Sequence, residues 1–169
     1  MLPKGATIAL LVNPNNPNAV RETKDVQEAA HALGLQLHVL NAGTERDLDA
    51  AFAVIEQRGA QALLIAGDAF FTGRRDQLIA LAARARLPTI YPLREFVVAG
   101  GLMSYGTSFI EAARQAGIYA GRILSGEKPA DLPVQQSVNF ELAINLKTAK
   151  TLGLEIPPNL LALADEVVE

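Results

Sequence analysis

The sequence predicts an α/β domain built around a parallel β-sheet in the flavodoxin-like strand order. Apolar runs of strand length alternate with stretches whose apolar residues recur at helical spacing, a pattern typical of βαβ units. The first run, residues 7–12, is apolar almost throughout, as expected for a strand covered on both faces. The 169 residues are enough for one domain with a packed core.

The first half of the chain contains four strand segments separated by helical segments. The strands are expected over residues 7–12, 35–40, 62–66 and 88–91. The helices are expected over residues 19–33, 44–59 and around 78–85. Two prolines and four asparagines in residues 13–18 predict a turn, and Asn18 is a good N-cap for the helix that follows. Thr44 with Asp47 three residues later is a variant of the capping box, whereas residues 67–73 read as a loop.

The pattern changes in the second half. Residues 92–101 are expected to form an irregular connection to a short strand over residues 102–105. A capping box that begins at Ser108 predicts a helix ending near residue 124. A late strand over residues 140–144 is expected to join the sheet, followed by a short helix.

Composition excludes several classes of protein. The net charge of −3 and the pI near 5.4 disagree with a nucleic-acid-binding surface, which needs a basic face. The absence of cysteine excludes disulfides, thiolate metal sites and cysteine nucleophiles. No apolar run is long enough to cross a bilayer, and the first residues show no signal-peptide pattern.

Five short motifs, spread over nearly the whole chain, resemble those of a known protein family. They are residues 13–17 (NPNNP), 68–71 (DAFF) with 74–75 (RR), 87–91 (LPTIY), 99–106 (AGGLMSYG) and 126–135 (GEKPADLPVQ). On these motifs the chain resembles the C-terminal part of the ABC transporter substrate-binding protein family, in the group allied to tryptophan- and tyrosine-binding solute receptors. The last two motifs are the most specific.

The resemblance implies a type I periplasmic-binding-protein plan, in which two α/β lobes joined by three chain crossings hold a ligand in the cleft. On this plan residues 1–92 and 134–169 form the second lobe, and residues 100–128 belong to the first lobe. Most of the first lobe and the export signal are then expected to be missing here, so that binding by this chain alone is expected to be weak. The parent protein is expected to be periplasmic or membrane-anchored outside the cytoplasm, with an ABC permease as its partner.

Ligands of open α/β sheets bind beyond the carboxyl ends of the strands, where this sequence places polar and aromatic side chains. Asp68 could pair with an ammonium group and Arg94 with a carboxylate, and aromatic rings could stack on a ligand ring. These groups suit a zwitterionic or aromatic small solute. The candidate ligand-binding residues are Asn15, Asn16, Asn41, Asp68, Phe70, Tyr91, Arg94 and Tyr105.

Each of these residue types also has a structural interpretation. Asparagine favours turns and helix caps, so the asparagines fit either role. Asp68 has no evident capping role in the sequence, which favours a ligand contact. Of Phe70 and Phe71, at least one is expected in the core. Tyr105 fits hinge packing as well as contact with a ligand in the cleft.

Signatures of catalysis and cofactor binding are missing from the sequence. It contains no dinucleotide-binding G-x-G-x-x-G after a strand, no P-loop and no G-x-S-x-G elbow. His31 and His38 share no metal-ligand spacing. We therefore expect a small-molecule binder without catalysis, metal or cofactor. Two alternatives stay open: a ligand-sensing domain of a regulator and, less favoured, a flavodoxin-like lyase or isomerase that would use Asp68 as one member of an acid–base pair.

The predicted helix near residues 108–124 also bears on oligomeric state. Without a first lobe, several apolar residues of the crossing segment have no evident core to cover, which predicts a homodimer. These residues are Leu102, Ile110, Ala113, Ile118, Tyr119 and Ile123. A partner could cover them by exchange of this segment, with residues 92–101 as the hinge. The competing outcome is a monomer whose helix folds back onto its own lobe.

Overall fold

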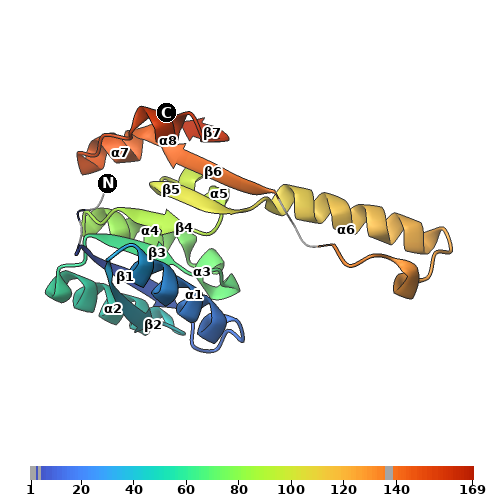
Figure 1. The fold of residues 1–169 in the computed structure, drawn as a ribbon, viewed down its shortest axis with the longest axis horizontal. Helices are drawn as coiled ribbons and strands as arrows, with labels where there is room; N and C mark the ends of the chain where they lie inside the picture. The colour runs from blue at the N-terminus through green and yellow to red at the C-terminus, as the bar shows by residue number, and fades with distance from the viewer. Residues whose placement is uncertain (1–2, 4, 136–138) are drawn as a thin grey trace.

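The computed structural model describes residues 3, 5–135 and 139–169, and these form a seven-stranded sheet in the order β2-β1-β3-β4-β5-β6-β7 (Figure 1). The strands are β1 (Thr7–Val12), β2 (Gln36–Asn41), β3 (Ala62–Ile65), β4 (Thr89–Tyr91), β5 (Met103–Thr107), β6 (Phe140–Asn145) and β7 (Glu166–Val168). β1 to β5 are parallel, β6 is antiparallel to β5, and β7 is parallel to β6. The parallel pairing of β1 with β2 and the flavodoxin-like order confirm the predicted fold class.

Short and long helices connect these strands. They are α1 (Ala19–Ala32), α2 (Glu45–Arg58), α3 (Ala69–Gly73), α4 (Arg75–Arg84), α5 (Arg94–Val98), α6 (Phe109–Leu124), α7 (Leu146–Leu152) and α8 (Pro158–Leu161), with a 3₁₀ turn over Pro129–Asp131. The capping box of Thr44 and Asp47 is present at the start of α2, and Gly59 ends that helix in the left-handed conformation. Asn145 likewise caps α7 through the Thr148 backbone N–H.

Alternation along β1 divides the core into two layers. Ala9 and Leu11 belong to a cluster with the buried residues of α2 and α4, whereas Leu10 and Val12 pack with residues of α1. Successive side chains of a strand point to opposite faces, so α1 covers one face of the sheet and α2 with α4 covers the other. The result is the three-layer arrangement expected for a strand that is apolar on both sides.

Several local predictions need correction. The predicted loop over residues 67–73 contains the short helix α3, and the irregular connection over 92–101 contains α5. β5, which lies in the segment expected to belong to the first lobe (residues 100–128), pairs with β4 and β6 in this sheet, and the assignment of that segment to a first lobe stays a prediction. β7 and α8 were not predicted, because each is too short to carry a periodic pattern.

α6 projects from the end of the β5–β6 ribbon as an arm that leads away from the sheet (Figure 1). None of its residues is buried, and Phe109, Ile110 and Leu124 expose 67%, 64% and 88% of their surface. The segment that follows lies along α6, where the Tyr119 hydroxyl donates to the Pro133 carbonyl at 2.6 Å. The helix therefore does not fold back onto its own lobe, although Leu102, expected to be uncovered, is buried.

Membrane-spanning helices are not found in the part of the chain that the structure describes, since no helix there combines the required length and hydropathy.

We predict that Gly106→Ala destabilises the lobe. A Cβ at residue 106 would lie 1.9 Å from the Pro92 carbonyl oxygen, which is backbone and has little freedom to move. Urea denaturation followed by circular dichroism should show a loss of about 1–3 kcal/mol in the free energy of unfolding. Gly73→Ala is the matched control, because a Cβ there meets nothing within 4 Å; its effect should stay below about 1 kcal/mol. Equal stabilities would mean that β5 and the Pro92 backbone separate readily.

Candidate functional site

Asp68 joins two polar loops at the carboxyl edge of the sheet. Its carboxylate accepts hydrogen bonds from the side-chain amides of Asn13 at 3.0 Å and Asn16 at 2.8 Å, both in the loop after β1. The same carboxylate accepts from the Phe70 backbone N–H at 2.8 Å and thereby caps α3. Asp68 therefore does have a capping role, and the expectation that it has none was wrong because α3 itself was not predicted.

The Asp68 carboxyl stays ionised at neutral pH. Burial opposes ionisation and is the largest single effect, but the Asn13 and Asn16 amides and the Phe70 and Phe71 backbone N–H groups together outweigh it. The pKa of the Asp68 carboxyl therefore lies below its ordinary value. None of the ion pairs among the described residues includes Asp68, so its negative charge is hydrogen-bonded without being neutralised.

A groove of about 440 Å³ opens beside Asp68, within the size range of small-molecule sites. It is lined by Asn16, Glu22, Gly67, Asp68, Ala69, Thr72, Pro92, Leu93, Tyr105, Gly106 and Thr107. Glu22 of α1 is a second carboxylate in the groove, and it accepts from the Gly67 backbone N–H at 3.2 Å. Tyr105 of β5 also lines the groove; its ring stacks on Phe140 at 5.7 Å between centroids and remains 60% exposed.

The groove therefore combines the negative charge of two carboxylates with an accessible aromatic ring. Carboxylates favour an ammonium or another cationic donor, and the Tyr105 ring offers a flat apolar surface. Within the described residues no cluster of histidine, aspartate and glutamate side chains could hold a metal ion. The arrangement suits recognition of a small cationic or zwitterionic organic molecule.

The structure brings Asn16, Asp68 and Tyr105 together in this groove and places the other candidates elsewhere. Tyr91 is only 1% exposed and stacks on Phe96 at 4.8 Å in the core. Phe70 packs against the core cluster and does not line the groove. The sequence pattern could not show this, because a residue that follows a strand can point inward as easily as outward.

Arg94, Asn15 and Asn41 do not line the groove and have other contacts. The Arg94 guanidinium makes a two-pronged ion pair with Glu166 at 2.7 and 2.8 Å, so β7 already supplies its carboxylate. Asn41 lines a separate hollow beside α1 instead of the groove. The Asn15 backbone N–H donates to the Asn13 side chain inside the turn.

Glu22 lines the groove but was not among the residues predicted to bind a ligand. The signal was present, because Glu22 lies in the first turn of α1 and helices that follow strands begin at the carboxyl edge of a parallel sheet. Thr72 and Leu93 were missed as well, since α3 and the start of α5 were assigned to loops.

A family model described as ABC transporter substrate binding protein matches residues 1–168. A conserved domain protein from Vibrio cholerae O1 biovar El Tor superposes with a TM-score of 0.87 at 26% identity, covering 98% of this chain and 56% of that one. None of the curated proteins compared with this sequence matches it.

Two further solved structures share the fold at lower identity. The ABC domain in complex with L-Trp from Streptococcus pneumoniae has a TM-score of 0.87 at 22% identity, covering 96% of this chain and 56% of that one. The ligand-free, open structure of a substrate-binding protein with adhesive properties from Clostridium difficile has a TM-score of 0.69 at 22% identity, covering 98% and 55%. The present chain spans little more than half the length of these proteins.

We predict that Asp68→Asn reduces the dependence of stability on pH. The pKa of Asp68 is lowered in the folded state, so its ionised form contributes stability that is present above the unfolded pKa of about 3.9 and lost as the pH falls through the folded-state value. Urea denaturation should show the wild type losing more stability than Asp68→Asn between about pH 6 and about pH 3. At neutral pH the variant should be less stable by about 1–2 kcal/mol, because an amide cannot accept from all three donors. Parallel pH profiles would show that the Asp68 charge does not support the loop.

Proposed function

This chain belongs to the ABC transporter substrate-binding protein family, and from that premise we propose that its groove is one wall of a cleft that captures a small organic solute. The observation that carries this proposal is the pairing of the Asp68 and Glu22 carboxylates with the exposed Tyr105 ring in one groove. The groove lies at the carboxyl edge of the sheet, where ligands of open α/β folds bind. The protein binds its solute for transport and does not turn it over.

The ligand proposed for this cleft is an amino acid or a related aromatic compound that carries an amino group. The ammonium group donates to Asp68, whose charge has no cationic partner among the described residues, and the ring of the ligand lies against Tyr105. The L-Trp bound to the Streptococcus pneumoniae neighbour supports this class of compound. Arg94 is paired with Glu166, so the carboxylate of the ligand is recognised from the opposite wall.

The opposite wall is proposed to come from a first lobe outside this chain. The solved relatives are nearly twice as long, which leaves room for a second lobe. α6 leaves the sheet beside the groove, and its apolar surface is free to pack on that lobe. The complete protein is proposed to work outside the cytoplasm and to deliver its solute to an ABC permease.

We predict that a two-lobe form of the protein binds L-tryptophan more tightly than this chain alone and that Asp68→Ala weakens this binding. Loss of a charge-assisted hydrogen bond should reduce the affinity at least about tenfold in isothermal titration calorimetry. Asn41→Ala is the matched control, since Asn41 lies outside the groove; its affinity should stay within about twofold of the wild type. Undiminished affinity of Asp68→Ala would remove Asp68 from the site.

We also predict that this chain alone forms a homodimer through α6. Each large apolar side chain that moves from water into an interface contributes roughly 1.5–3 kcal/mol, and α6 exposes several of them. Light scattering should give a mass near twice 18.0 kDa at micromolar concentration. Ile110→Glu with Leu124→Glu should restore the monomer, whereas Val20→Glu, the same kind of change at an exposed residue of α1, should not. A mass of 18.0 kDa for the wild type throughout this range would rule the dimer out.

A further inference from the structure

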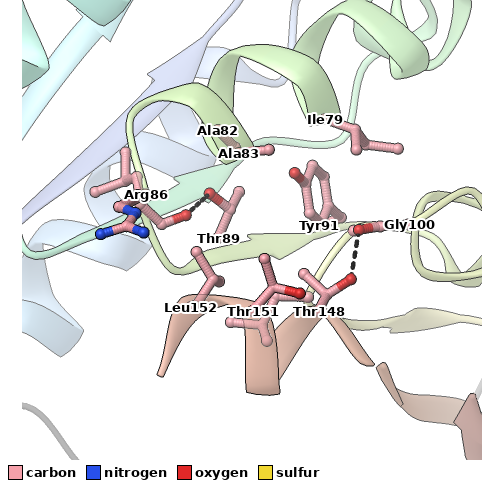
Figure 2. Close-up of a pocket in the computed structure, with 13 residues that line it drawn as sticks. Ile79, Ala82, Ala83, Arg86, Thr89, Tyr91, Gly100, Thr148, Thr151 and Leu152 are labelled. Atoms are coloured by element: carbon pink, nitrogen blue, oxygen red, sulfur yellow. Dashed lines mark hydrogen bonds between the residues drawn. The ribbon is translucent and has the colours of Figure 1, made fainter. Parts of the chain in front are cut away.

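A second hollow lies between α4 and α7, away from the groove. Its volume is about 150 Å³, and it is lined along one side by α4 and along the other by α7. Figure 2 shows Ile79, Ala82 and Ala83 above it and the side chains of α7 below it, with Arg86 at one end. We call this hollow the α4–α7 pocket. Arg86 and Leu87 precede β4, so this end of the pocket lies at the amino edge of the sheet, opposite the carboxyl-edge groove.

The pocket is built into the fold because two anchors hold α7 at a fixed position. The Asn145 side-chain amide donates to the Val97 carbonyl at 3.1 Å, and the Thr148 hydroxyl donates to the Gly100 carbonyl at 2.8 Å. Gly100 and Gly101 form the adjoining floor, where no side chain fills the space. A Cβ on Gly101 would lie 2.7 Å from the Tyr91 ring, so a larger residue does not fit there.

The walls of the pocket are mainly apolar, and most of the hydroxyl protons beside it are committed to the protein. Thr148 donates to Gly100, Thr151 donates to the Lys147 carbonyl at 2.9 Å, and Thr89 donates to the Leu87 carbonyl at 2.9 Å. The three threonine hydroxyls therefore offer little to an anion, and the apolar side chains of the lining suit a hydrocarbon body. A cavity of about this volume in another protein accommodates a molecule of about six carbons.

Arg86 gives one end of the pocket a different character. Its backbone has a φ of 50°, and it is the sole non-glycine residue with positive φ in the described part of the chain. It occupies the position after α4 where glycine is usual, which is an unfavourable conformation for a residue with a Cβ. Arg86 takes part in none of the ion pairs among the described residues. The Arg86 side chain thus lies at one end of the pocket, at a position where the backbone conformation favours glycine.

We propose that the α4–α7 pocket binds a short-chain aliphatic carboxylate, with the carboxylate on Arg86 and the chain between α4 and α7. The planar guanidinium matches a carboxylate with two parallel hydrogen bonds. The apolar chain would replace water against Ala82, Leu102 and Leu152. This site is separate from the solute groove and does not depend on the function proposed for it.

Titration of the 169-residue chain with hexanoate, followed by two-dimensional amide NMR, tests the proposal. Saturable shifts are expected at Arg86, Thr148 and Thr151, with the Gly67 amide of the groove unchanged. Arg86→Gly should weaken hexanoate binding by about tenfold or more, because the charged partner is lost. Glycine suits the backbone at residue 86, so the variant should melt at least as high as the wild type. Arg84→Ala, which removes an exposed cation that does not line the pocket, is the control.

Two further measurements distinguish recognition of the carboxylate from general hydrophobic binding. Thr151→Leu, which fills the pocket at the cost of a bond within its own helix, should abolish the shifts without loss of folding. Hexan-1-ol and hexylammonium should bind clearly more weakly than hexanoate. The proposal is overturned by an absence of saturable shifts in the wild type, by equal affinity for the three compounds, or by unchanged affinity of Arg86→Gly.

Discussion

The Asp68 carboxylate accepts hydrogen bonds from the loop after β1 and from the start of α3, and the shape of the groove depends on this shared acceptor. β1 and β3 are neighbours in the sheet, so their following loops begin side by side. Without a common acceptor, the Asn13 and Asn16 amides would have to be satisfied by water. The same contacts stabilise the charge that distinguishes this edge of the sheet.

The groove is also shaped by residues that are held for other reasons. Arg94 is held by Glu166, so the bend after β4 is tied to the last strand of the sheet. This bend carries Pro92 and Leu93 into the groove wall. Segments far apart in sequence therefore define one wall through packing and ion pairing, while the charge comes from Asp68 and Glu22.

The fold was predictable from the sequence because its main elements are long and periodic. The apolar run of β1 predicts a buried strand, and the capping box of α2 and the glycine after it predict the two ends of that helix. The sheet and its covering helices agree with these local predictions. Four elements were not predicted: α3, α5, β7 and α8. Each has at most five residues and depends on tertiary contacts, so its sequence shows no periodic pattern. The site was predictable only at polar residues that follow strand ends and whose side chains point into the groove. Asp68 and Asn16 follow strand ends and carry polar groups, whereas Tyr91 turns into the core and Arg94 finds a partner 72 residues away.

The pairing of β5 with β6 sets where the arm can be attached. Thr107 is opposite Phe140 in the antiparallel register, so the chain leaves the sheet and returns to it at adjacent positions. The arm is thus a modular insertion between the two strands of a ribbon. A β-hairpin turn of about two residues could close the same ribbon. The lobe is topologically complete without the arm, and residues 108–139 can be grafted, exchanged or deleted as one unit without rerouting any strand of the sheet.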